Sequence, residues 1–270
     1  MKLIPQYLLA LIWCASFMTT SSLSAVDIIA HRGSSFLAPE NTVASCALAW
    51  EERADAVELD VHLTRDGKLA VIHDADTKRT TGAPGLVREG NWSGLQALDA
   101  GSWKSPKYTG EKIPSLDDCL ANGPDGRRFF IEVKCGPEAV PELVASLGRS
   151  GLKPDQVVII SFSREVVAAV KKAAPEYRSL WLVGGGRDKA KGRTPTLDEV
   201  IAEAKALSAD GLDLSAAWPI DVEFVAKVKK EGLGLWVWTV DDPAHAQRLK
   251  DAGVDGITTN RPGWLRERLH

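Results

Sequence analysis

The sequence is poor in cysteine and has no C-x-x-C pair. Only four of its 270 residues are cysteine, and Cys14 falls within the first 25 residues. The other three, Cys46, Cys119 and Cys135, are too few and too widely spaced for a disulfide framework, a zinc site or a redox site. We therefore expect buried free thiols, with one bridge at most.

A long apolar run is also missing beyond the first 25 residues. No later segment approaches 18 uninterrupted apolar residues, which argues against a transmembrane protein. Residues 1–25 contain one charged group, Lys2, then an apolar stretch that ends at Trp13, and small polar residues up to Ala25. This is the layout of a secretory signal peptide, with an uncleaved anchor as the alternative. We expect export to a periplasm or out of the cell, and a domain over residues 26–270 without stable membrane insertion.

The chain lacks a basic block, an internal repeat and a low-complexity linker. Without the first 25 residues it keeps 32 basic and 36 acidic residues, and a mild acidic excess of this kind argues against nucleic acid as a partner. Hydrophobic residues make up 44% of the chain and charged residues 26%, so the remaining residues, about 245, can bury a sizeable core.

Short apolar runs alternate with helix-like segments from residue 26 onward, which favours a parallel sheet with crossover helices. Helix starts are readable at Ser163, at Thr196 with Glu199, and at Asp242 followed by Pro243. The predicted parallel strands are Val26–Ala30, Ala56–His62, Phe129–Val133, Val157–Ser161, Leu180–Val183, Gly211–Leu214, Leu235–Thr239 and Gly256–Thr258. Eight such strands predict a (β/α)₈ barrel. A doubly wound open sheet is the alternative, but no G-x-G-x-x-G follows the first strand.

A ninth apolar run, Lys68–Ile72, follows Ala56–His62 too closely for a parallel return. Asp66 and Gly67 form a two-residue turn signal, so we expect a tight antiparallel hairpin with Arg65 opposite Lys68. Counting outward then places Asp60 opposite His73. The hairpin is followed by residues 74–114, which have little periodicity and read as an insertion near the active site.

Three carboxylates stand on strands that are otherwise apolar. Glu58 and Asp60 are two positions apart and share one face, and Glu132 ends the next barrel strand. Converging carboxylates repel each other unless a cation separates them, and an all-oxygen ligand set favours one Mg²⁺ or Ca²⁺ ion. The alternative is ion pairing with Lys134 or Arg32 without a metal.

Two histidines reach the same region. His31 follows the first strand, and the hairpin brings His73 beside the predicted metal site. Two imidazoles suit an acid and a base, while Arg32 and Lys134 can hold an anionic group such as phosphate. The remaining polar and aromatic candidates receive lesser roles: His62 is solvated or supports the site, Asp74 makes hydrogen bonds at the hairpin end, His245 and His270 lie on the surface, and Trp238 walls the site.

Six motifs in register resemble the glycerophosphodiester phosphodiesterase family. They are His31-Arg32-Gly33, Pro39-Glu40-Asn41-Thr42, Glu58-Leu59-Asp60-Val61, Thr64-Arg65-Asp66-Gly67, His73-Asp74 and Glu132-Val133-Lys134, with Trp238-Thr239-Val240 and Gly253 to Thr259 following later in the chain. The similarity covers about residues 27–264.

The resemblance implies a metal-dependent TIM barrel of the phospholipase-C-like phosphodiesterase type. Such an enzyme hydrolyses glycerophosphodiesters to sn-glycerol 3-phosphate and an alcohol, a reaction of glycerol and lipid metabolism. It implies these roles: Glu58, Asp60 and Glu132 bind the ion, His31 and His73 are the acid and base, Arg32 and Lys134 contact the phosphate, Glu40 supports the site, and residues 74–114 shape substrate access. Asn260, where Asp is frequent, and Cys135 depart from the common pattern.

Several alternatives stay open. A lysophospholipase D or sphingomyelinase D-like enzyme would use the same plan on membrane lipids and need an apolar mouth, for which the insertion offers Trp92, Leu95 and Trp103. A noncatalytic barrel would lack a ligand or a histidine, and none is missing. A glycosidase would not explain the histidines and cations. The head group, the choice between Mg²⁺ and Ca²⁺, the assignment of acid and base, the route of attack on phosphorus and the oligomeric state do not follow from the sequence.

Overall fold

The computed structural model describes residues 26–124, 126–185 and 193–270. The predicted signal, residues 1–25, lies outside the described residues. Eight parallel strands close into a barrel: β1 pairs with both β2 and β9, and the remaining neighbours run from β9 through β4 to β2. The fold is therefore the predicted (β/α)₈ barrel, and the doubly wound alternative is wrong.

The strand bounds agree with the apolar runs to within two residues. The strands in the described ranges are β1 (Asp27–Ala30), β2 (Ala56–Leu63), β3 (Leu69–Val71), β4 (Arg128–Val133), β5 (Val157–Ser161), β6 (Arg178–Val183), β7 (Gly211–Ser215), β8 (Gly234–Trp238) and β9 (Gly256–Thr259). Branched and aromatic residues dominate these runs, as expected for strands that are buried on both faces.

A helix follows each parallel strand. The α-helices are α1 (Val43–Glu51), α2 (Lys78–Thr81), α3 (Trp92–Leu95), α4 (Leu116–Ala121), α5 (Val140–Ser150), α6 (Arg164–Ala173), α7 (Leu197–Ala206), α8 (Val222–Lys230), α9 (Pro243–Ala252) and α10 (Pro262–Arg266), and four short 3₁₀ helices span Val87–Glu89, Pro106–Tyr108, Pro137–Ala139 and Pro154–Gln156. The predicted caps at Ser163, Thr196 and Asp242 all accept hydrogen bonds from first-turn backbone amides. No helix among these described residues has the length and apolarity needed to cross a bilayer.

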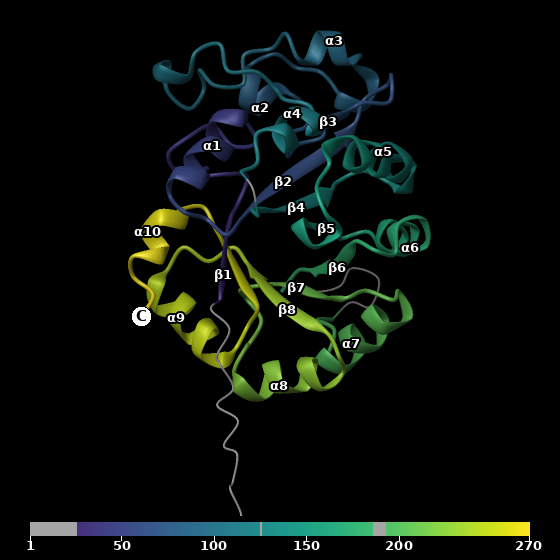
Figure 1. Cartoon of the computed structure of the whole chain (residues 1–270), viewed down its shortest axis with the longest axis vertical. Helices are drawn as coiled ribbons and strands as arrows, with labels where there is room; N and C mark the ends of the chain where they lie inside the picture. Colours follow the sequence, from purple (N-terminus) through teal and green to yellow (C-terminus); the bar gives the residue numbers. More distant parts are fainter. Residues whose placement is uncertain (1–25, 125, 186–192) are drawn as a thin grey trace, which may run out of the picture.

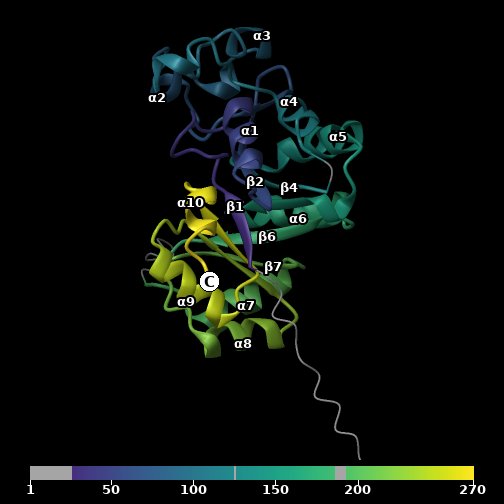
Figure 2. The ribbon, with the colours of Figure 1, turned by 60° about the vertical axis from the view of Figure 1, so that its left-hand side comes forward.

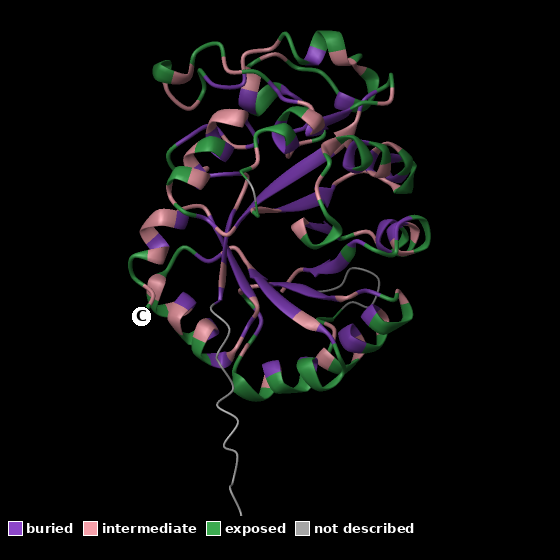
Figure 3. Cartoon of the chain, in the orientation of Figure 1, coloured by how far each residue is buried: buried purple, intermediate pink, exposed green. Residues whose placement is uncertain are grey.

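Helices α1 and α4 to α10 surround the strands, and the segment that contains α2 and α3 extends beyond α1 and α4 (Figures 1 and 2). The strands are almost wholly buried and the helices expose their outer faces (Figure 3). Alternate residues of β2 serve different environments: Val57, Leu59 and Val61 pack toward the helices, whereas Glu58 and Asp60 take the opposite face, toward the barrel interior. Two-residue periodicity thus brings polar side chains into the barrel.

The hairpin exists, but its predicted register is wrong by one residue. Strand β3 is antiparallel to β2, with Leu63 opposite Leu69 and Val61 opposite Val71. Asp60 therefore lies opposite Ile72, whose backbone N–H donates to the Asp60 carbonyl at 3.0 Å. The physical cause is a loop of three residues instead of two, in which Gly67 has a φ of +79°.

Residues 74–114 form a satellite with its own small core. Apolar side chains of this segment pack on β3 and the residue after it, in a cluster of Ala70, Ile72, Val87, Leu95, Ala100 and Ile113. The three described cysteines are free thiols, as predicted, with Cys46 and Cys119 buried and Cys135 half-buried. The barrel is therefore held by packing and hydrogen bonds among the described residues, without disulfides.

Candidate active site

One pocket gathers most of the predicted site residues at the carboxyl ends of the barrel strands, where TIM-barrel active sites lie. It is lined by His31, Arg32, Glu58, His73, Glu132, Lys134, Ile160, Phe162, Leu182, Asp213, Trp238, Thr239 and Thr258. Of the nine residues predicted for the site, only Asp60 and Glu40 are missing from this lining. Asp60 belongs to the carboxylate group described next, and Glu40 lies behind Arg32.

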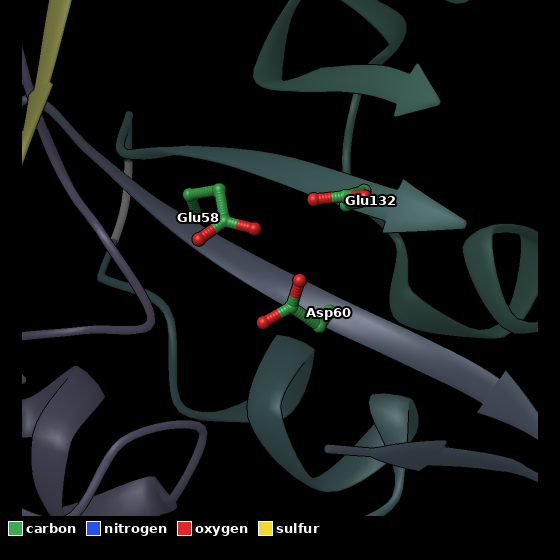
Figure 4. A group of neighbouring side chains, drawn as sticks. All are labelled: Glu58, Asp60 and Glu132. Carbon is green, nitrogen blue, oxygen red and sulfur yellow. The ribbon is translucent and has the colours of Figure 1, made fainter. Parts of the chain in front are cut away.

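Glu58, Asp60 and Glu132 converge as the sequence predicted. Asp60 on β2 and Glu132 on β4 are partners across the parallel strand pair, and Glu58 lies two residues before Asp60. One carboxylate oxygen from each residue lies within 4.8 Å of the others. The three side chains point toward one another from the two strands (Figure 4). All three residues are buried.

The electrostatics of this carboxylate triad fit a cation. Burial and the neighbouring Asp60 raise the pKa of Glu132 to about 7, and burial with both other carboxylates raises the pKa of Glu58 well above its usual range. Glu58 Oε1 and Asp60 Oδ1 are buried without a hydrogen-bond partner in the described part of the chain. Buried orphaned oxygens in an all-carboxylate set are the donors that Mg²⁺ or Ca²⁺ takes.

Arg32 and Lys134 flank the triad, and their positive charges offset part of its negative charge. Arg32 Nε lies 3.2 Å from Asp60 Oδ2, and Lys134 Nζ lies 2.9 Å from Glu132 Oε1 and 3.6 Å from Asp60 Oδ1. Burial acts to lower the pKa of Lys134, but the two carboxylates outweigh it and raise that pKa. Among the described residues, no basic side chain pairs with Glu58, so the alternative of ion pairing without a metal leaves one carboxylate uncompensated.

The turn after β1 has a strained backbone. Arg32 has a φ of +56° and Gly33 a φ of +79°, and a Cβ on Gly33 would lie 2.4 Å from Ser45 Oγ. Only glycine fits beside Ser45 at this point. The turn lets the Arg32 backbone N–H donate to Glu58 Oε2 at 2.9 Å while its guanidinium reaches Asp60. The H-R-G motif thus places a backbone donor of Arg32 on Glu58 and its guanidinium in an ion pair with Asp60.

Each of the two site histidines has its Nδ1 atom held by a side-chain oxygen. His31 Nδ1 lies 2.7 Å from Asn260 Oδ1, and His73 Nδ1 lies 2.7 Å from Asp74 Oδ1. Because both oxygens are acceptors, both Nδ1 atoms carry a proton and donate. Nε2 is therefore the ring nitrogen left for the pocket. Burial, and next Arg32, lower the pKa of His31, which keeps its imidazole neutral.

Glu40 binds two arginines instead of facing the pocket. Its carboxylate accepts from Arg32 Nη1 at 2.8 Å and from Arg79 Nη2 at 2.7 Å. Arg79 also donates through Nε to Asp74 Oδ2 at 2.7 Å, and Asp74 holds His73. A chain of ion pairs thus joins α2 of the insertion to both Arg32 and His73.

Several residues of the site were not predicted from the sequence, among them Asn41, Phe162 and Asp213. Asn41 Nδ2 donates to Asp60 Oδ2 at 2.7 Å, and the Asp60 backbone N–H donates back to Asn41 Oδ1 at 3.1 Å. Phe162, after β5, and Asp213, in β7, line the pocket. An acid in the apolar run Gly211–Leu214 is the same signal that identified Glu58, and it could have identified Asp213.

The structure also gives the positions of the residues to which the sequence assigned lesser roles. His62 is half-buried and its Nε2 lies 3.1 Å from the His73 carbonyl oxygen, which is a supporting position. His270 is exposed and His245 is half-buried on α9. Trp238 lines the pocket and donates through Nε1 to the Asp213 carbonyl oxygen at 3.1 Å.

Comparisons with known proteins agree with one another. The sequence model of the glycerophosphoryl diester phosphodiesterase family matches residues 31–264. A glycerophosphodiester phosphodiesterase of Bacillus subtilis (strain 168) is 35% identical over 252 residues, which cover 87% of this chain and 83% of the relative. Another from Caldanaerobacter subterraneus subsp. tengcongensis is 36% identical over 243 residues, or 88% of this chain and 95% of the relative.

Solved structures show the same similarity. An Oleispira antarctica phosphodiesterase in complex with the product sn-glycerol-3-phosphate is 29% identical, with a TM-score of 0.79 over 90% of this chain and 96% of the other. A glycerophosphodiester phosphodiesterase from Agrobacterium tumefaciens is 30% identical, with a TM-score of 0.75 over 90% and 99% of the two chains.

Proposed function

The chain belongs to the glycerophosphoryl diester phosphodiesterase family and is a phosphoric diester hydrolase, and on that premise we propose how its site works. The enzyme hydrolyses glycerophosphodiesters to sn-glycerol 3-phosphate and an alcohol, using one divalent cation on the carboxylate triad and His31 with His73 as the acid–base pair. The observation that carries this proposal is that two Nδ1-anchored histidines line the same pocket as Glu58 and Glu132, two members of the buried carboxylate triad.

Glu58, Asp60 and Glu132 would hold the cation. A bound Mg²⁺ or Ca²⁺ supplies positive charge to phosphate oxygens as negative charge builds on them. The donor set of three carboxylates, two with orphaned buried oxygens, supports this assignment. Asn41 keeps Asp60 in place through its two hydrogen bonds.

The side chains of this site have complementary tasks. Arg32 and Lys134 attract the anionic diester and offset charge on its oxygens. The Nε2 atom of one histidine takes the proton of the attacking oxygen, and Nε2 of the other gives a proton to the leaving alcohol oxygen. The Oleispira antarctica relative binds sn-glycerol-3-phosphate, which supports the same product class here.

Product detection with glycerophosphocholine tests the proposal. EDTA-treated protein is assayed for sn-glycerol 3-phosphate and choline by ³¹P and ¹H NMR, alone and with Mg²⁺, Ca²⁺ or Mn²⁺ added. We expect no turnover without an ion and restored turnover with at least one. Full activity of the metal-free protein would contradict the metal assignment, and release of phosphocholine would contradict the bond that we propose to be cleaved.

A lysophospholipase D activity is the second candidate because apolar side chains are exposed after β1 and in the insertion. Phe36 is 51% exposed, Leu37 50% and Trp103 39%. Comparing the rates on glycerophosphocholine and lysophosphatidylcholine separates the candidates, and a higher kcat/KM on the lysolipid would favour this second one. The family and its named relatives argue against a noncatalytic barrel.

We also propose that the protein is exported after removal of residues 1–25, on the basis of their charge and apolar pattern. N-terminal sequencing of the protein from fractionated cells tests this. An intact Met1 on cytoplasmic protein would contradict export.

A further inference from the structure

Asp213 is a buried acid that the site described so far does not use. It lies at the centre of β7, is 1% exposed, and lines the same pocket as the two histidines. Its Oδ1 atom has no hydrogen-bond partner among the described residues. Its backbone, in contrast, is held on both sides by β6 and β8. The backbone of Asp213 is therefore held in place, while its Oδ1 atom is left without a hydrogen-bond partner in the part of the chain that the structure describes.

Burying a carboxyl without a hydrogen-bond partner costs free energy. A ligand that supplies the missing partner gives a physical reason for such a carboxyl in a pocket. Arg32 and Lys134 pair with Asp60, Glu132 and Glu40, and in the described chain no cation pairs with Asp213. Burial, and next Glu132, raise the pKa of Asp213 well above its usual range. In either protonation state the carboxyl accepts a hydrogen bond from an alcohol, and in the neutral state it also donates one.

The pocket has a closed part and an open part. Asp213 neighbours Leu182 on β6 and Trp236 on β8, both inside the barrel and almost fully buried. Phe162, in contrast, is 46% exposed and packs edge-to-face on Trp238 with ring centroids 5.5 Å apart. A substrate with one constant half and one variable half fits such a pocket best with the constant half in the closed part.

We propose that Asp213 binds a hydroxyl group of the glycerol half of the substrate in the closed part of the pocket, while the alcohol half lies toward Phe162. This inference rests on the proposed function, because glycerophosphodiesters share the glycerol half and differ in the alcohol. Asp213 is thereby a specificity residue for a vicinal diol.

Substituting Asp213 by Leu, of similar size and without polar atoms, tests the assignment. Inhibition of glycerophosphocholine hydrolysis is measured with sn-glycerol 3-phosphate and with inorganic phosphate. We expect Asp213→Leu to raise the inhibition constant of sn-glycerol 3-phosphate about tenfold, which corresponds to the loss of one buried hydrogen bond. The inhibition constant of inorganic phosphate should not change. Asp213→Asn, which keeps an acceptor and a donor, is expected to stay within about threefold of wild type.

Two substrates separate this proposal from the function itself. Wild-type turnover of glycerophosphocholine tests the function, and bis(4-nitrophenyl) phosphate, which has no glycerol, provides a reference rate. Asp213→Leu is expected to lower kcat/KM on glycerophosphocholine about tenfold without lowering the reference rate. If wild type is active and Asp213→Leu loses kcat/KM equally on both substrates, the role proposed for Asp213 is overturned and the proposed function still stands.

The charge of the alcohol half gives a further check. If Asp213 instead bound the choline cation, Asp213→Asn would lose glycerophosphocholine turnover and keep that of glycerophosphoglycerol, whose alcohol half is uncharged, which would overturn the proposal. Because the orphaned carboxyl costs folding free energy, Asp213→Leu is expected to melt no lower than wild type. Should it fail to fold, Asp213→Ala serves in the same assays with the same expected losses.

Discussion

His31 Nδ1 lies 2.7 Å from Asn260 Oδ1, and Asp241 determines which way the Asn260 amide points. Asn260 donates to Asp241 through Nδ2 at 2.6 Å and through its backbone N–H at 2.9 Å. The amide oxygen must therefore face His31. A neutral amide holds His31, whereas the carboxylate of Asp74 holds His73, so the two imidazoles have electrostatically different partners.

Asn260→Ala is expected to lower kcat because His31 loses the acceptor that selects its tautomer. Loss of such a supporting contact reduces activity by about 10- to 100-fold in comparable sites. Steady-state kinetics on glycerophosphocholine measure the change, and KM should move little. Ser35→Ala is the matched control, since Ser35 Oγ donates to the same Asn260 oxygen at 3.0 Å without touching His31. Equal losses in both variants would contradict the tautomer role.

His31→Ala and His73→Ala are each expected to abolish measurable turnover while leaving the circular dichroism spectrum and melting temperature close to wild type. Removing one general acid or base costs about 10²- to 10⁴-fold in rate. His270→Ala, at the exposed end of the chain, provides the control and should keep full activity. Near-normal hydrolysis by either pocket variant would refute the acid–base assignment.

A divalent cation is expected to raise the melting temperature of the EDTA-treated protein. At 100 times Kd the ion stabilises the fold by about 2.7 kcal/mol, or about 5 to 10 °C for a domain of this size. Glu58→Gln should remove most of this shift, because Glu58 offers an orphaned oxygen to the ion. Glu89→Gln, at an exposed carboxylate, should keep it. A shift that survives in Glu58→Gln would place the ion elsewhere.

Asp74 should contribute to stability in a pH-dependent way. Hydrogen bonds from Arg79 lower the pKa of Asp74 from 3.8 to about 2 in the folded protein. A lowered folded-state pKa stabilises the fold above the unfolded pKa, and this contribution is lost as pH falls from about 4 through about 2. Asp74→Asn is thus expected to lower the urea midpoint at pH 7, by less than about 1 kcal/mol of free energy of unfolding, because Asp74 is only half-buried and its partner Arg79 is exposed, so that solvent screens the ion pair.

The same comparison at pH 4 and pH 2.5 checks the sign. The difference between wild type and Asp74→Asn should be clearly smaller at pH 2.5 than at pH 4, because pH 2.5 lies well below the unfolded-state pKa of 3.8 and close to the folded-state pKa of about 2. A difference that stays constant would show that the ion pair with Arg79 does not stabilise the fold.

Much of the site was predictable because it depends on local periodicity. Glu58 and Asp60 are two residues apart on a strand, so the backbone alone places them on one face. Adjacent parallel strands then bring in Glu132, and the H-R-G turn after β1 brings in His31 and Arg32. These relationships need only strand geometry and strand order.

The register of the hairpin could not be predicted from the local turn signal alone. A two-residue turn at Asp66-Gly67 predicted Asp60 opposite His73, whereas the actual three-residue loop places Ile72 there. Thr64 stabilises this loop: its Oγ1 donates to Asp66 Oδ1 at 2.7 Å and accepts from the Lys68 backbone N–H at 2.9 Å. His73 still reaches the pocket, because its position depends on Asp74 and Arg79 as well as on the strand pair.

The sequence by itself determined the alternation of strands and helices, the closure of eight strands into one barrel, and the residues whose charges and imidazoles face its interior. Tertiary structure alone decided which partner each of these groups has. Asn41 on Asp60, Asn260 on His31 and Glu40 on Arg79 are contacts between segments that no local period relates. Strand periodicity specifies a direction for each side chain, whereas a hydrogen bond requires two atoms within about 3 Å, and only the packed loops set that distance.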